Sequence, residues 1–188
     1  MPPRRSPFAR LFADLAKALS ELGVDWYLFG AQAALLYGAT RVTADVDVTV
    51  RLGACTLQEL TASLSRNGFE LRKTAPGFVE TTRVLPLLHV SSQIPADVVL
   101  AGPGLEDAFM ERSLERKVGG VTLFVATPED LIVMKVLAGR EKDLADVREV
   151  LAAHPVNLAL VRDTLALLEA ALEQSDLLPV FEELVAPG

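Results

Sequence analysis

Apolar residues recur along the chain with two different periods, and the change of period outlines the secondary structure. At residues 8–22 they recur every three or four positions, which predicts an amphipathic helix. Residues 26–29 form a short apolar run typical of a buried strand that ends at Gly30, and residues 31–38 have the composition of a short helix. Strict alternation of valine with polar residues at 45–51 predicts a second strand with one buried face.

The rest of the chain continues this alternation of helices and strands. We expect a helix at 57–66, a strand at 69–72, strand-like runs at 78–84, 86–91 and 96–101, a short helix at 104–112 and a strand at 121–126. Thr127 and Pro128 then predict the start of a helix that runs to about residue 138, because threonine caps helices and proline is tolerated at their first position. Residues 143–184 predict helices that are interrupted near Pro155 and Pro179.

This order of elements predicts an α+β protein with a mixed sheet flanked by helices. We expect residues 1–140 to form the α/β domain and residues 141–188 to form a C-terminal helical segment packed on it. The helical segment carries an apolar stripe made of Leu158, Val161, Leu165, Leu168 and Leu172. Core packing is the favoured interpretation of this stripe, and a partner-binding groove is the alternative.

Composition narrows the class of protein. The 188 residues are 51% apolar but only 6% aromatic, so the core must be aliphatic. Cys55 is the single cysteine, which rules out an internal disulfide and favours a reducing compartment. The net charge of −7 argues against binding nucleic acid by bulk charge. Because no signal-peptide core or membrane span is visible, we expect a cytoplasmic protein.

Two aspartates stand on the second strand. Asp45 and Asp47 lie two residues apart and therefore share one face of the strand with Thr49. Aspartate is disfavoured in strands, and two like charges side by side cost stability unless a cation lies between them. A hard cation such as Mg²⁺ prefers such oxygen ligands. The alternative is a solvated strand face on which Arg41 or Arg51 neutralises the pair.

Gly30 separates the first strand from the short helix that follows. In such a turn, backbone N–H groups can meet a phosphate group. An ordinary strand-to-helix turn is the alternative, and taken alone it is the favoured one.

A third acidic residue, Asp97, lies within an apolar strand and is the only charged residue between Arg83 and Glu106. A lone carboxylate there needs a partner or a metal ion. The alternative is an aspartate that caps a turn after Pro95. His89, on the preceding strand, is interpreted as a hydrogen-bonded or half-exposed strand histidine and not as a catalytic group.

Lys135 lies in a helical segment, residues 131–138, that is apolar on every side. Such a helix is normally buried, and a buried ammonium group must pair with a carboxylate or face a wet cleft. Asp143, at the start of the next helix, is well placed to pair with it. The alternative is a lysine that extends along the helix to reach the surface.

Residues 28–47 resemble the opening motif of the DNA polymerase beta-like nucleotidyltransferase superfamily. The pattern Arg41-x-Thr43-x-Asp45-x-Asp47 is most similar to the abortive-infection toxin type, which belongs to type IV toxin–antitoxin pairs. A second signature of that type follows about 100 residues later. It is carried by Pro128-Glu129-Asp130-Leu131, Lys135, Arg140, Lys142, Asp143 and Asp146. The resemblance covers roughly residues 10–152.

The resemblance implies a nucleotidyltransferase-like fold and a set of functional residues. It implies that Asp45, Asp47 and Asp97 hold two Mg²⁺ ions, and that Asp97 accepts the proton of the acceptor. It further implies a phosphate-facing turn and other nucleotide contacts from Gly30, Ala31, Arg41, Thr43 and Asp143. Lys135 is expected to offset charge on the phosphates, and a structural pairing of Lys135 with Asp143 is the alternative.

Three interpretations of function remain open. The first is an active, Mg²⁺-dependent nucleotidyltransferase that moves an NMP from an NTP to a hydroxyl group of tRNA, other RNA or protein, as the toxin partner of an antitoxin protein. The second is an enzyme that modifies a small molecule such as an antibiotic. The third is a degenerate nucleotide-binding or partner-binding module, which is supported by Gly30-Ala31 where the superfamily usually has Gly-Ser or Gly-Gly. Basic residues that could line an RNA groove are interpreted instead as solvated surface charges: Arg72, Lys73, Arg83, Arg112, Arg116 and Lys117.

Overall fold

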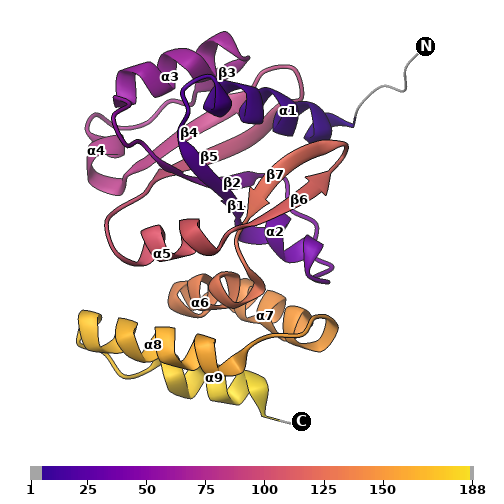
Figure 1. The fold of residues 1–188 in the computed structure, drawn as a ribbon, viewed down its shortest axis with the longest axis vertical. Helices are drawn as coiled ribbons and strands as arrows, with labels where there is room; N and C mark the ends of the chain where they lie inside the picture. Colours follow the sequence, from indigo (N-terminus) through magenta and orange to yellow (C-terminus); the bar gives the residue numbers. More distant parts are fainter. Residues whose placement is uncertain (1–5, 187–188) are drawn as a thin grey trace. The chain divides into compact units, whose positions relative to one another are not determined.

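The structure, a computed structural model, describes residues 6–186. The basic start of the chain at residues 1–5 and the last two residues lie outside the described part. The expected α+β class is confirmed, because helices and one mixed sheet alternate along the chain (Figure 1). Within residues 6–186, no helix is both long enough and apolar enough to cross a membrane.

Most elements begin and end within a few residues of the predicted positions. The helices are α1 (Pro7–Ser20), α2 (Gly30–Leu36), α3 (Leu57–Arg66), α4 (Phe78–Thr82), α5 (Leu105–Arg112), α6 (Pro128–Ala138), α7 (Glu141–Ala153), α8 (Leu158–Leu172) and α9 (Leu177–Val185). The strands are β1 (Asp25–Phe29), β2 (Val46–Arg51), β3 (Phe69–Leu71), β4 (Val84–His89), β5 (Ile94–Leu100), β6 (Leu114–Val118) and β7 (Val121–Val125).

The sheet has the strand order β3-β4-β5-β2-β1-β7-β6. Strand β2 is its centre and pairs antiparallel with β1 and parallel with β5. Strand β7 runs parallel to β1, and the outer pairs β3–β4, β4–β5 and β6–β7 are antiparallel. The central position of β2 places the residues on it in the middle of the sheet.

The alternation on β2 has the predicted effect. Val46, Val48 and Val50 are completely buried, whereas Asp47 on the opposite face is half-buried. Helices α1 and α3 pack against each other, and α1 also contacts β5 and β7 (Figure 1). The core of this part is aliphatic only in the main, because it also buries the aromatic side chains of Phe12, Trp26, Tyr27, Phe69 and Phe109.

The chain forms two compact units, each built from two stretches of sequence. One, here called the sheet unit, combines the residues up to Phe29 with Thr43–Ala126. The other, here called the helical unit, combines Gly30–Val42 with the residues from Thr127 onward. The expected boundary at residue 140, between an α/β domain and a C-terminal helical segment, stays a prediction.

Helix α6, the first helix in the longer stretch of the helical unit, starts where the sequence predicts. The Thr127 hydroxyl oxygen accepts a hydrogen bond from the Asp130 amide at 3.1 Å, and Pro128 is the first residue of α6. The predicted break near Pro155 lies between α7 and α8. The second break falls at residues 173–176 and not at Pro179, which lies in the first turn of α9, where proline costs no hydrogen bond.

Two predictions in the sheet unit are wrong. Residues 78–82 form helix α4 and not a strand, because glycine at 77 and Arg83 both adopt left-handed backbone conformations that delimit a single short helix. Strand β6 is absent from the prediction, because its residues 115–117 are all charged and exposed. It forms through the Gly119-Gly120 hairpin, whose two positive φ angles of 58° and 80° fit a tight two-residue turn.

Candidate active site

A row of five residues crosses the sheet unit at one level of the sheet. Phe29 on β1 pairs with Asp47 on β2, and Asp47 pairs with Asp97 on β5. Asp97 pairs in turn with Pro86 on β4, and the Arg72 amide donates a hydrogen bond to the Pro86 carbonyl at 2.9 Å. Residues that are partners on adjacent strands point to the same face of the sheet. The register therefore places two carboxylates and a guanidinium on one face; we call these five residues the carboxylate row.

Asp47 and Asp97 are direct neighbours in this row. Adjacent strands lie about 4.8 Å apart, so the register brings the two carboxylates close together without any loop between them. Two neighbouring carboxylates repel each other unless positive charge is supplied. The register thus places Asp97 beside Asp47, while Asp45 lies before the first residue of β2.

Asp45 lies just before β2 and is exposed, with its carboxylate bound by its neighbour Thr43. The Thr43 hydroxyl donates a hydrogen bond to Asp45 Oδ1, and the Asp45 amide donates to the same hydroxyl oxygen at 3.5 Å. Thr43 is itself buried. A short local hydrogen-bonded turn therefore fixes how the chain enters β2.

Arg72 supplies positive charge to the row. Its Nη2 donates a hydrogen bond to Asp97 Oδ1, reaching across the strand that carries Pro86. Arg72, interpreted as a solvated surface charge, is 39% exposed and also pairs with Asp97. Arg51, one of the two proposed neutralising residues for the β2 aspartates, instead pairs with Asp25 and Asp107, and these two partners raise the pKa of its guanidinium.

The chemistry of the donors in the row fits a hard divalent cation. Oxygen is the ligand atom that Mg²⁺ prefers, and Mg²⁺ is commonly held by one or two carboxylates, with substrate phosphates completing the shell. Across residues 6–186, no three histidine, cysteine, aspartate or glutamate side chains converge into a ready metal cluster. The row therefore fits an ion that is shared with a bound phosphate better than one held by protein ligands alone.

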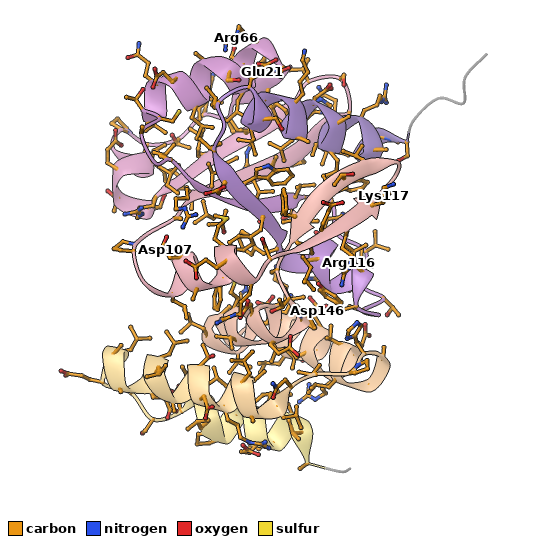
Figure 2. All side chains as sticks on the ribbon, in the orientation of Figure 1. Glu21, Arg66, Asp107, Arg116, Lys117 and Asp146 are labelled. Carbon is orange, nitrogen blue, oxygen red and sulfur yellow. The ribbon has the colours of Figure 1, made fainter. Side chains whose placement is uncertain are left out.

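A second cluster of charges lies in the helical unit, and its three central charges are buried. Lys135, Asp143 and Asp146 have exposed fractions of only 4%, 3% and 1%. Lys135 Nζ donates to Asp146 Oδ2 at 2.6 Å and to Asp143 Oδ1 at 3.1 Å. Arg140 Nε donates to Asp143 at 2.5 Å, and Arg41 binds Asp146 through Nε at 3.0 Å and Nη2 at 2.8 Å. We call these five residues the buried ion network; Asp146 is labelled in Figure 2.

The network keeps both of its carboxylates ionised. Burial alone raises the pKa of Asp143, but hydrogen bonds from Arg140 and Lys135 outweigh it and hold that pKa below its usual value. For Asp146, burial also raises the pKa, and hydrogen bonds from Arg41 and Lys135 bring it below the usual value. The predicted pairing of Lys135 with Asp143 is confirmed; sequence reasoning missed Asp146 as its second partner.

The segment that leads to Arg41 is docked along α7. Gly38 packs against Ala153 so closely that a Cβ on Gly38 would lie 2.3 Å from the Ala153 Cβ. The Thr40 amide donates to Glu149 Oε2 at 2.5 Å, and Arg41 binds Asp146 one turn further along the helix. The chain therefore runs antiparallel to α7, and each contact falls on the same helix face.

Gly30 and Ala31 form the first turn of α2 in the helical unit. Gly30 has a φ of 69°, a conformation that favours glycine, and Ala31 is buried. Gly30 directly follows Phe29, the β1 member of the carboxylate row, in the chain. A residue with a side chain would be strained at this φ, so the backbone conformation explains why glycine stands at position 30.

Histidine 89 has the structural role expected from the sequence. It is fully buried, its Nδ1 lies 2.7 Å from the Ser92 hydroxyl oxygen, and its Nε2 lies 3.0 Å from Asp14 Oδ2. Its ring also packs on Phe69, with 4.8 Å between the ring centroids. These contacts link β4 to β3 and α1.

The sequence of the chain matches a described protein family over residues 7–177, nearly its full length. That family is described as nucleotidyltransferase of unknown function, DUF6036. The chain belongs to this nucleotidyltransferase family. As a family member it is a transferase enzyme, while the specific toxin type suggested by the motif spacing stays a prediction. No curated protein matches the chain by sequence.

Solved structures show the same nucleotidyltransferase fold at low sequence identity. The antibiotic-resistance factor ANT(2'')-Ia is 16% identical with a TM-score of 0.59, and the match covers 88% of this chain and 94% of that one. A nucleotidyltransferase-like antigenic protein from Paracoccidioides brasiliensis is 19% identical with a TM-score of 0.53 over 95% of both chains. The lincosamide antibiotic adenylyltransferase LnuA, with lincomycin bound, is 14% identical with a TM-score of 0.53, covering 75% of this chain and 94% of that one.

Proposed function

We propose that this nucleotidyltransferase moves an NMP from an NTP to an acceptor hydroxyl and depends on Mg²⁺ held by Asp47 and Asp97, with Asp45 as a further ligand. The observation that carries the proposal is the direct pairing of Asp47 with Asp97 on parallel central strands. When bound there, Mg²⁺ would offset charge on the phosphates and lower the barrier to attack at the α-phosphorus. The acceptor oxygen forms the new bond to phosphorus, and pyrophosphate leaves.

The residues of the chain have separate tasks in this proposal. Asp97 accepts the proton of the acceptor hydroxyl as the new bond forms. Gly30 and Ala31 contribute the turn that faces the phosphates, whereas both fork nitrogens of Arg41 bind Asp146 and support the fold of the helical unit. Thr43 holds the entry to β2, as its hydrogen bonds to Asp45 indicate.

Lys135 and Asp143 have a structural role in this proposal. Both side chains are almost completely buried. They bind each other, Lys135 also binds Asp146, and Asp143 also binds Arg140, so their charged groups are already engaged within the protein. A buried charge with fixed partners stabilises one arrangement of helices, because removing either partner leaves the other unpaired. This favours the alternative in which the pair supports the fold.

Two classes of acceptor follow from different observations. The spacing of the motifs favours RNA, including tRNA, or protein, with the enzyme acting as a toxin that a partner antitoxin restrains. The likeness to ANT(2'')-Ia and LnuA favours a second candidate, an antibiotic-like small molecule, although the shared property there is the fold. The reaction at the α-phosphorus is the same for both.

A labelling experiment tests the proposal. The protein is incubated with Mg²⁺ and each α-labelled NTP, with total tRNA, with cell protein and with aminoglycoside and lincosamide antibiotics as separate acceptors. We expect one NTP and one acceptor class to become labelled, and Asp47→Ala to abolish the label. Asp163→Asn, a change at an exposed aspartate on α8, serves as the control that keeps activity. Equal labelling by wild type and Asp47→Ala, or no label with any pair, would contradict the proposal.

A further inference from the structure

Arg72 is the one basic residue of the carboxylate row, and it is held in an unusual way. Its backbone is fixed, because its amide donates to the Pro86 carbonyl at 2.9 Å. Its side chain spans from the end of β3 to Asp97 on β5, two strand positions or about 10 Å away. The guanidinium therefore lies on the same face as Asp47 and Asp97.

The guanidinium uses only part of its hydrogen-bonding capacity. Nη2 donates to Asp97, whereas the Nε–H is buried and finds no acceptor within the part of the chain that the structure describes. A buried donor without a partner is costly, because it has lost its hydrogen bond to water and gained none in return. Protein interiors rarely leave such a donor unpaired, and an unpaired one at a functional site indicates an absent partner.

Two other arginines show what a completed pairing looks like. Arg41 donates from both Nε and Nη2 to Asp146, at 3.0 and 2.8 Å. Arg162 does the same to Glu182, at 2.6 and 3.0 Å. Both use the side-on fork that matches two oxygens of one anion. In Arg72 half of that fork holds Asp97 and the other half is unused.

The partner that fits this fork is the phosphate chain of a nucleotide. Phosphate oxygens accept bidentate hydrogen bonds from arginine, and a cation bound by Asp97 would compete with Arg72 for the same carboxylate. The Arg72 and Asp97 side chains as a whole are 39% and 33% exposed, although the Arg72 Nε atom is itself buried, so a ligand can approach the two side chains and would meet Nε only when the guanidinium leaves Asp97.

We propose that Arg72 is a phosphate-binding residue of the active site. It neutralises Asp97 while no ligand is present, and it hydrogen-bonds the NTP phosphates once a metal ion takes over that carboxylate. This inference rests on the proposed function, because it needs an NTP and a metal ion at the carboxylate row.

Binding measurements test this role without relying on turnover. Calorimetry is carried out with Mg²⁺ alone, and then with Mg²⁺ at saturation and each NTP or inorganic tripolyphosphate. We expect Arg72→Ala to bind Mg²⁺ alone several-fold more tightly, because the competitor for Asp97 is gone. We expect the same variant to bind NTP and tripolyphosphate at least about tenfold more weakly, as the loss of a charged hydrogen-bond pair predicts.

Two further variants separate this role from a structural one. Arg72→Lys keeps the charge beside Asp97 but loses the fork, so it should keep the melting temperature of the wild type and still bind NTP more weakly. Arg116→Ala, a change at an exposed arginine on β6 that Figure 2 labels, should bind both ligands as the wild type does. If Arg72→Ala does not fold, the Arg72→Lys measurement decides.

The outcomes distinguish this inference from the proposed function. If the wild type transfers an NMP and both Arg72 variants bind nucleotide as the wild type does, Arg72 is only a counter-ion of Asp97 and the inference is wrong. If the wild type binds no NTP and no tripolyphosphate with Mg²⁺, the proposed function and the inference are both wrong.

Discussion

The two clusters of charge in this protein use the same residue types in different ways. In the sheet unit, Asp47 and Asp97 are partly exposed, and Asp97 has one hydrogen bond from one nitrogen of Arg72. In the helical unit, Asp143 and Asp146 are buried, and each binds two cationic side chains. Buried carboxylates that bind two cations stabilise a fold, whereas carboxylates that solvent can reach are accessible to a ligand. The comparison predicts that mutations in one cluster change the chemistry and mutations in the other change stability.

The largest effect on stability is expected from Lys135→Met. Methionine fills a similar volume but leaves Asp143 and Asp146 next to each other in the interior, without the ammonium group between them. Breaking such a buried pair should lower the free energy of unfolding by about 3 kcal/mol. Urea unfolding followed by circular dichroism measures this loss. An unchanged urea midpoint would show that the buried ion network does not stabilise the protein.

The docked segment at Gly38 should show the next largest effect. Gly38→Ala places a Cβ 2.3 Å from the Ala153 Cβ on a backbone with a φ of 101°, and should cost about 2 kcal/mol. Gly104→Ala is the matched control, because Gly104 has a φ of 98° and no atom within 4 Å of the added carbon. The difference between the two melting temperatures isolates the cost of the close approach to α7. Equal losses in the two variants would mean that the contact with Ala153 contributes nothing.

Acid should weaken the buried ion network by protonating its carboxylates. The pKa of Asp146 lies below its usual value of 3.8 in the folded protein. Its contribution to stability is therefore complete above the unfolded pKa and is lost as the pH falls through the lower, folded pKa. Thermal unfolding between pH 7 and pH 3 should show a fall in melting temperature below about pH 4 that is smaller in Asp146→Asn. The same fall in both proteins would assign the acid sensitivity to other groups.

The smallest effect is expected at an exposed pair with the same geometry. Glu182 accepts both fork nitrogens of Arg162 at 2.6 and 3.0 Å, as Asp146 does from Arg41, but both partners lie at the surface. Glu182→Gln should therefore leave the free energy of unfolding almost unchanged, whereas Asp146→Asn should lower it clearly. Equal losses would show that burial is not what separates these pairs.

Local signals in the sequence predicted most of the fold. The periods of the apolar residues, the Thr127-Pro128 helix start and the alternation on β2 are properties of neighbouring residues, and their elements were found. Residues 78–82 were assigned wrongly because their β-branched composition favours a strand, while two left-handed residues enforce a short helix. Strand β6 was missed because its pairing with β7, and not an apolar face, holds it in the sheet.

The candidate site could be predicted only in part, for a related reason. Asp45 and Asp47 stand out because two carboxylates on one strand are unfavourable. Asp97 and its partner Arg72 lie 25 residues apart in the chain. Their pairing depends on the register of β3, β4 and β5. The pairing of Arg41 with Asp146 spans 105 residues and could not be read from either motif. Long-range register and helix packing decide these contacts, and a single sequence does not display them.

The comparison between the two clusters is tested most directly by one paired measurement on Asp47→Asn and Asp143→Asn. The rate of NMP transfer and the free energy of unfolding are determined for both variants and for the wild type. We expect Asp47→Asn to lose about 10³-fold in rate and to keep its stability within about 0.5 kcal/mol. We expect Asp143→Asn to lose about 2 kcal/mol or more of stability and to keep its rate within a few-fold at a temperature where it is folded. The opposite pattern, a stable but inactive Asp143→Asn beside an active Asp47→Asn, would contradict the account.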